Sequence, residues 1–423
     1  MAQQTVIHAS HLGAVYVSEE TVTFGTAGTE RRIHPRVDTA SLVPEQTEIE
    51  ALRLRVVAHD PTKPVRGYKG ASGGFEHYLQ PDSTYLVTAA TPDGDAASPL
   101  SVPMRCILGG ESIAAGATIP SGTYNVNGRV FDVGTGQGAR LVEGQICAVD
   151  QSNGGTEDLV PCRVTTRSTD TITVWPALAA APDAGGRVIN SRTWYATQTN
   201  TRSMSLALAP ANGTALEYRA TGGTGNVSIS FTRGELVTAN FELTFADFTG
   251  PANLSLGAAV AADPMASPLS TRGAKMYLQP VATTTRTCVK VDSFTLNITS
   301  GMEHLDTLTC GVEGRKGVMR SAGLTEAFAT IDLVCDVDTD YDTSYWTSQT
   351  DLSLMLFVQL DVSASVRRFV VIDAPRVFVV GKPRVERGDN NLSKMSLTLR
   401  LLRDNTTTGT GDLATAPLRI ATI

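Results

Sequence analysis

The sequence predicts an all-β protein, built as two tandem β-sandwich or barrel modules with a small all-β insertion domain. Three observations predict this: 53 of the 423 residues are Thr, Gly and Pro number 38 and 20, and no long apolar stripe has helical spacing. Thr favours strands, whereas Gly and Pro mark turns. The apolar fraction of 42% is enough for real cores, and the length corresponds to roughly two or three domains.

Composition excludes several classes of protein. The net charge of −7 argues against a protein that binds phosphate backbones over its whole surface. No apolar run reaches the ~18 residues of a membrane span, and the N-terminus does not resemble a secretory signal. The chain has 28 Arg but 7 Lys, which favours fixed ion pairs at interfaces. Its six cysteines are too few for a disulfide scaffold, so we expect buried free thiols.

Changes in composition along the chain predict its organisation. We expect the following segments: an N-terminal arm at 1–45, a first module formed by 46–104 plus 200–256, an inserted β domain at 105–199 with Gly-rich turns, a linker at 257–269, a second module at 270–405 and a C-terminal tail at 406–423. Both terminal segments are expected to be disordered in a monomer and to fold on contact with neighbouring chains.

Alternating apolar and polar residues predict the strands within the modules. Asn226–Phe231 and Asn240–Phe245 alternate cleanly, and the turn Thr232–Glu235 is expected to join them as a hairpin. Further strands are expected at 47–57, 291–298, 324–335, 352–360, 376–380 and 396–401. A short helix fits near Tyr345–Asp351.

Two pairs of segments suggest an internal repeat. Leu52–Asp82 resembles Leu308–Asp336, and Gly225–Asp247 resembles Arg376–Asp404, in the same order in both halves. The second pair shares a strand, a turn with Arg-Gly and an acid, and a strand that ends at Asp. Chance similarity among β segments is the alternative. Duplication of one module would let a ring close with half as many subunits.

Three stretches resemble the tail tube proteins of long-tailed phages. They are Tyr16–Glu20 with Phe24–Thr26, Leu141–Gly144 with Pro176–Pro182 and Gly185, and Leu206–Tyr218 with Gly222-Gly223, Val227–Phe231 and Val237–Leu243. They resemble, in turn, the N-terminal region, the β insertion and the closing strands of that family.

The resemblance implies a structural virion protein. Its subunits would form stacked rings around a lumen that conducts DNA during ejection without specific binding, and its partners would be itself and other tail proteins: tape measure, terminator and baseplate. Assembly would take place in the host cytoplasm. Two modules imply a homotrimeric, pseudo-hexameric ring, whereas a single module implies a hexamer. Another tail component, such as a terminator, a baseplate ring or a contractile-tail inner tube, is an alternative.

One acidic run is a candidate site. From Ser321 to Val366 the chain has no Lys or Arg, and it contains Asp336, Asp338, Asp340 and Asp342. If the run is a strand, alternation places these aspartates on one face, which would line the lumen or an exposed surface. An EF-hand is not expected because Tyr341 and Thr347 occupy positions six and twelve. Another calcium cage is an alternative reading.

Nothing in the sequence predicts catalysis, a metal or a cofactor. Gly70–Gly74 matches G-x-S-x-G, but the alternating segment after it favours a strand rather than the helix of a nucleophile elbow. Only His8 and His11 have metal-like spacing, and no C-x-x-C occurs. We therefore expect no enzyme. A carbohydrate-binding adhesin is a further alternative, which would need Trp175, Trp194 and Trp346 to be clustered and exposed.

Overall fold

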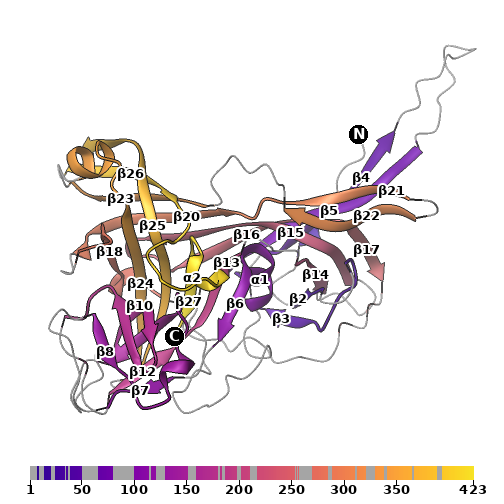
Figure 1. Ribbon diagram of the computed structural model, residues 1–423. Helices are drawn as coiled ribbons and strands as arrows, with labels where there is room; N and C mark the ends of the chain where they lie inside the picture. The colour runs from indigo at the N-terminus through magenta and orange to yellow at the C-terminus, as the bar shows by residue number, and fades with distance from the viewer. Residues whose placement is uncertain are drawn as a thin grey trace, which may run out of the picture.

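Strands make up most of the protein in the computed structural model (Figure 1). The structure describes residues 7–423 apart from 9–13, 21–23, 34, 37–38, 50–64, 80–99, 114–115, 121–128, 151–158, 180–181, 183–185, 198–201, 210–216, 253, 255, 257–268, 284–287, 310–311, 321–328, 338–340, 364–365 and 388–392. The expected linker lies almost entirely outside the described residues, as do Asp338, Asp340 and much of the strand expected at 47–57.

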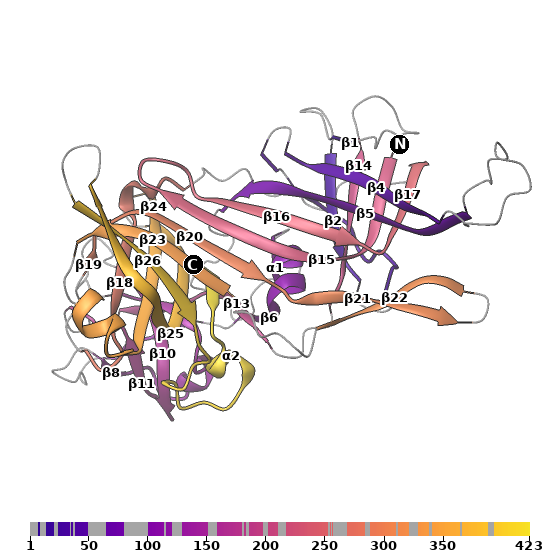
Figure 2. The same ribbon diagram turned by 90° about the horizontal axis from the view of Figure 1, so that it is seen from above.

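One long antiparallel sheet runs through the molecule (Figure 2). Among the described residues, consecutive neighbours in this sheet are β4 (Ser41–Ile49), β5 (Val65–Tyr78), β16 (Thr238–Phe245), β15 (Glu217–Thr232), β20 (Val291–Thr299), β23 (Ala329–Asp336), β26 (Ser393–Leu401) and β25 (Val366–Arg387), and we call this row of strands the long sheet. The expected hairpin is confirmed, since Ser230 pairs with Thr238 and Thr224 with Thr244. Alternation is clean in β16, where every second residue from Ala239 to Phe245 is buried.

A second layer covers the apolar face of the long sheet. Beside the first half of the chain it contains β2 (Ala14–Glu19), β14 (Met204–Ala209) and β17 (Asp247–Ala252), and beside the second half β18 (Lys275–Pro280), β24 (Leu352–Ser363) and β27 (Arg419–Thr422). The long strands β15 and β25 belong to both layers. Their N-terminal halves pair with strands of the second layer, which we call the back layer, and their C-terminal halves pair with strands of the long sheet. One apolar core fills the space between the layers.

The order of these pairings occurs twice. In the first half β2 pairs with β14, β14 with β15, β15 with β16 and β16 with β5. In the second half β18 pairs with β24, β24 with β25, β25 with β26 and β26 with β23. The strands β17 and β27 occupy matching places beside β15 and β25. This repeated topology supports the duplication that the sequence suggested, at the level of strands.

A helical element stands at the same point of each half. Helix α1 (Ser101–Leu108) precedes β14, and a helical turn, η3 (Tyr341–Trp346), precedes β24. All eight residues of α1 are buried. The turn begins before the helix expected at Tyr345–Asp351, and α1 is an element that the sequence analysis did not predict.

A separate sheet lies within residues 105–199 (Figure 1). Its strands are, in order, β7 (Ala117–Thr118), β12 (Arg187–Asn190), β9 (Ile146–Asp150), β10 (Leu159–Ser168), β11 (Thr171–Trp175) and β8 (Val130–Asp132). It has its own apolar cluster, which includes Phe131, Val149 and Val174. The strands β6 (Gly109–Ile113) and β13 (Arg192–Ala196) pair with each other and join this sheet to the main body.

Both ends of the chain depart from the expectation of free arms. Ala14–Glu19 is strand β2, whose Val15 and Val17 are buried because it pairs with β14. Near the C-terminus, α2 (Asp412–Thr415) precedes β27, which is buried throughout and pairs with both β13 and β25. Residues 413–423 are thus part of the folded subunit, not a tail that awaits assembly.

Two hairpins extend from the same end of the long sheet (Figure 2). One is formed by β4 and β5, and the other by β21 (Met302–Thr309) and β22 (Val312–Arg320), which form a two-stranded sheet of their own. The turn between β15 and β16 lies at the opposite end. Thr238, the first residue of β16 after this turn, pairs with Tyr78, which is the last residue of β5 and lies farthest from the hairpin tip. The long sheet therefore has a hairpin end and a turn end.

The cysteines are free thiols wherever the structure describes them. Cys106, Cys147, Cys162 and Cys335 are buried as expected, whereas Cys288 is exposed. Burial raises the pKa of the Cys106 and Cys147 thiols, so they are protonated and unreactive at neutral pH.

Candidate functional site: the polar face of the long sheet

The second face of the long sheet carries polar side chains, and we call it the polar face. Its residues alternate with the core residues of each strand and are mostly Ser, Thr and Asn. They include Ser72, Glu76, Tyr78, Asn226, Ser228, Ser230, Thr238, Asn240, Glu242, Thr244, Thr295, Asn297, Thr299, Thr330, Asp332, Val334, Lys394, Ser396, Thr398 and Arg400. Alternation in β15, β16 and β20 is the sequence signal for this face, which was not among the predicted sites.

Charges of both signs lie on the polar face and partly neutralise one another. Arg36 forms an ion pair of 3.0 Å with Glu76, and the Thr398 hydroxyl donates to Asp332 at 2.7 Å. Across β15 and β20 the Ser228 hydroxyl donates to the Asn297 side-chain oxygen at 2.9 Å. The face therefore offers hydroxyl and amide groups rather than a strong field of either sign.

The two described ends of the acidic run lie in different elements. β23 ends at Asp336, and the chain is helical from Tyr341 to Trp346. Lys394 donates to Asp336 at 2.8 Å, and this hydrogen bond lowers the pKa of the Asp336 carboxyl. Asp338 and Asp340 lie outside the described residues, as does the side chain of Asp342. A lumenal or surface position for the run as a whole stays a prediction.

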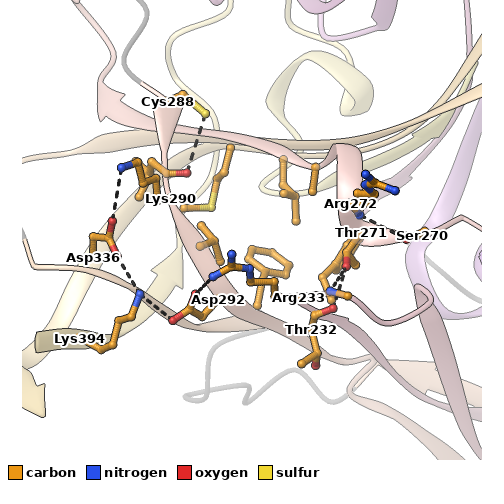
Figure 3. A pocket seen from close by; sticks show the side chains of 18 residues that line it. Thr232, Arg233, Ser270, Thr271, Arg272, Cys288, Lys290, Asp292, Asp336 and Lys394 are labelled. Atoms are coloured by element: carbon orange, nitrogen blue, oxygen red, sulfur yellow. Dashed lines mark hydrogen bonds and ion pairs between the residues drawn. The ribbon is translucent and has the colours of Figure 1, made fainter. Parts of the chain in front are cut away.

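A pocket of about 810 Å³ opens at the turn end of the long sheet (Figure 3). Apolar residues that include Phe231, Met276 and Phe294 line it together with polar and charged ones. Charged side chains of both signs lie around it, with Lys394 bound to Asp292 at 2.8 Å and Arg233 3.7 Å from Asp292. The described residues contain no group of three or more His, Cys, Asp or Glu side chains that could hold a metal ion.

The G-x-S-x-G match is part of a strand. Ser72 lies within β5, opposite Val43 on one side and Thr244 on the other. A Cβ atom on Gly74 would stand 2.0 Å from the Phe241 carbonyl oxygen, so glycine is required here for close packing of backbones. The motif is therefore explained by strand packing and not by a nucleophile elbow.

A protein-family comparison decides the affiliation of the chain. A family model described as phage tail tube protein matches residues 10–386. The chain belongs to the phage tail tube protein family. It is thus a structural component of a phage tail, and it belongs to the virion. No curated protein matches the sequence, and no helix among the described residues is long and apolar enough to cross a membrane.

In this tail tube protein a buried ion network attaches the inserted sheet to the main body. Arg163 of β10 binds Asp373 of β25 at 2.6 Å, Arg419 of β27 binds Asp373 at 3.0 Å, and Arg419 also binds Asp404 at 2.8 Å. All four side chains have 0% exposure. Burial lowers the pKa of the Arg163 guanidinium and the charge of Asp373 opposes this shift. The Arg-rich composition predicted fixed pairs of this kind, although not which residues form them.

A second network fixes the strands that lead into the inserted sheet. Glu111 of β6 accepts from Arg192 at 2.7 Å and from Arg105 at 3.1 Å, and it also accepts from the Trp194 indole at 3.0 Å. Arg105 reaches Glu19 of β2 at 2.7 Å. Helix α1, the connecting strands and the back layer are therefore held in one arrangement.

The first network, which joins Arg163, Asp373, Arg419 and Asp404, predicts a loss of stability in acid. Burial alone would raise the pKa of the Asp404 carboxyl, but the charges of Arg163 and Arg419 outweigh it and lower the pKa to about 2. A carboxyl whose folded pKa is depressed stabilises the fold above its unfolded pKa of 3.8, and the effect disappears as the pH falls through about 2. We expect Asp404 to contribute about 2 kcal/mol at neutral pH.

This expectation is checked by urea unfolding at pH 6, 4 and 2.5 of the wild type and of Asp404→Asn. The wild type should lose more of its free energy of unfolding over this range than the variant does. Equal losses in the two proteins would contradict the role given to Asp404.

Proposed function

We propose that this chain is the ring-forming subunit of the tail tube, and that its polar face lines the lumen of stacked rings. The observation that carries the proposal is that, among the described residues, both terminal strands of the long sheet have an outer edge that is unpaired or paired over only two residues. Beyond Val377, β25 is paired with β26 on one side alone among the described strands. At the other end of the sheet, β4 is paired with β5 along its length and with a two-residue strand on its outer edge.

The free edge of β25 has an apolar side chain that a neighbour would cover. Val385 lies opposite the buried Met395 and is 57% exposed, whereas Phe231, near the end of the matching strand β15, is 5% exposed. β15 differs in one respect: its C-terminal half is covered by β20. We propose that β4 of the neighbouring subunit, the counterpart of β20, covers β25 in the same way.

Repeating this junction closes a ring. The β15–β20 junction inside the chain and the proposed β25–β4 junction between chains would alternate around the lumen, so that three chains of two modules each form a pseudo-sixfold barrel. Closure removes both edges, which would otherwise be sites of indiscriminate pairing. The inserted sheet is attached to the back layer and would decorate the outer wall.

The polar face suits a lumen through which DNA passes during ejection. Stable binding of DNA requires many Lys and Arg contacts with phosphates. The polar face offers mainly hydroxyls and amides, and its cations include Lys394, which is bound to Asp292 and Asp336. The acidic run in the sequence suggested an acidic lumen, whereas the hydroxyl and amide side chains of the polar face support a nearly neutral one.

The adhesin alternative finds little support. Trp175 and Trp194 are buried, with 0% and 1% exposure, and Trp346 packs partly buried against the main core. These side chains do not form an exposed aromatic platform for a sugar. A terminator or baseplate ring shares the ring geometry, and the length of the assembly distinguishes it from a tube.

Electron microscopy of the purified full-length protein, with light scattering on the same sample, tests the proposal. We expect hollow tubes or stacked rings of uniform width, with three protomers of 44.7 kDa in each ring. Single rings that never stack would favour the terminator or baseplate alternative. A monomer that forms no rings at high concentration, even when added to isolated tail initiation complexes, would contradict the proposal.

A further inference from the structure

The outer edge of β4 carries a strand of the same chain. β1 (Ile7–His8) pairs antiparallel with it, Ile7 opposite Leu42 and His8 opposite Ser41. The inner edge of β4 pairs with β5, where Ser41 lies opposite Gly74 and Leu42 opposite Gly73. The outer edge of β4 is therefore paired at Ser41 and Leu42 before any neighbour arrives.

We infer that β1 is an autoinhibitory strand, which occupies the assembly edge of the free subunit and leaves it when a neighbouring β25 pairs there. The inference rests on the proposed function, since that function makes the outer edge of β4 an assembly edge. Each edge of a strand pairs with one partner at a time. Occupation by β1 and by a neighbour's β25 is thus mutually exclusive at these residues.

The internal junction shows why β1 would yield to a neighbour. β15 and β20 are paired from Asn226–Thr299 to Thr232–Ser293, whereas β1 covers two residues of β4. A β25–β4 junction as long as the β15–β20 junction would form more backbone hydrogen bonds and bury more side chains than the β1–β4 pairing does. β1 would therefore slow the first encounter between subunits without preventing a completed ring.

The other free edge has a protection of its own. In β25 the pairing with β26 shifts register between Val380 and Arg384, and the bulge contains Gly381, Lys382 and Pro383. Bulges, Lys and Pro are devices that discourage indiscriminate pairing of an edge. β4 also has a Pro, at 44, and a register shift between Gln46 and Glu48. Unlike the free edge of β25, it carries in addition a paired strand, because β1 covers Ser41 and Leu42 just before Pro44.

A truncation tests the inference. We expect removal of residues 1–12 to lower the critical concentration for ring or tube formation about tenfold, because two or so backbone hydrogen bonds no longer compete with the neighbour. Sedimentation and electron microscopy over a concentration series measure this. A critical concentration that is unchanged or higher would overturn the inference and would favour an arm that bridges subunits.

A reversible crosslink provides the second test and does not depend on the truncation. His8→Cys with Ser41→Cys, in a Cys288→Ser and Cys310→Ser background, places two thiols on paired residues whose spacing permits a disulfide. The oxidised protein should remain monomeric, and a reducing agent should restore assembly. The two single-cysteine variants are the controls and should assemble under both conditions.

The outcomes separate the inference from the function on which it rests. Assembly of the oxidised, crosslinked protein at the wild-type concentration would overturn the inference while the tube function stands. Failure of every protein to form rings, the wild type and the reduced variants included, would contradict the proposed function and the inference with it.

Discussion

Replacing Asp373 by alanine is expected to lower the free energy of unfolding by roughly 3–5 kcal/mol, the cost typical of breaking a buried ion pair. Asp373 lies between Arg163 and Arg419, with no exposure to solvent. Arg419 would keep Asp404 as an ion-pair partner. Arg163 would keep a 3.4 Å contact with the Ser353 hydroxyl and the Trp175 ring, whose centroid is 5.1 Å from its guanidinium carbon, but it would lose its carboxylate partner. A buried guanidinium without a carboxylate is the physical origin of the loss.

Urea unfolding measures this loss, and an exposed ion pair provides the matched control. Asp351 pairs with Arg376 at 2.6 Å, but its side chain is 39% exposed. We expect Asp351→Ala to cost less than about 1 kcal/mol. A second variant, Asp373→Leu with Arg163→Leu, should recover much of the stability because no charge is left unpaired. Similar losses for Asp373→Ala and Asp351→Ala would contradict the importance of the network.

Replacing Val385 by aspartate is expected to abolish ring formation and to leave the monomer folded. The side chain is 57% exposed in the subunit, so the substitution should change the free energy of unfolding by less than about 0.5 kcal/mol. In the proposed ring a neighbour's β4 would cover it. A carboxylate buried there without a partner would cost several kcal/mol at every junction, which corresponds to a loss of affinity of more than about 100-fold.

Val142→Asp is the matched control for this prediction. Val142 is also an exposed valine, at 43%, but it lies in the inserted domain between η1 (Gly138–Arg140) and β9. Circular dichroism should show both variants folded, and electron microscopy should show rings for Val142→Asp alone. Normal rings from Val385→Asp would place the junction between subunits elsewhere.

The fold could be predicted from the sequence where burial alternates within a single layer. Asn226–Phe231 and Asn240–Phe245 alternate strictly, and both the hairpin and its turn are where the pattern placed them. The pattern is less informative for β15 and β25, because each passes from one layer to another and its pairing changes along its length. Helix α1 was missed since it is short and buried on all sides, so it has no polar stripe.

The candidate site was less predictable than the fold. Alternation gives a polar face to any half-buried strand, but it does not distinguish an edge strand from a central one. The exposure of Val385 depends on the absence of a neighbour, which is a property of the tertiary arrangement and not of the local sequence. The buried ion pairs of Arg163 and Arg419 were equally hard to predict. Arg163 and Asp373, for example, are 210 positions apart in the sequence, and composition alone cannot show that they meet.

The β15–β20 junction would have a kinetic consequence for assembly of the proposed ring. Because both of its strands belong to one polypeptide, this junction forms during folding and without any loss of translational freedom between separate molecules. Half of the lateral contacts in the proposed ring would then exist before the first encounter. A ring of three chains needs fewer collisions than a ring of six, so incomplete arcs would be shorter-lived and fewer kinds of partial ring could accumulate.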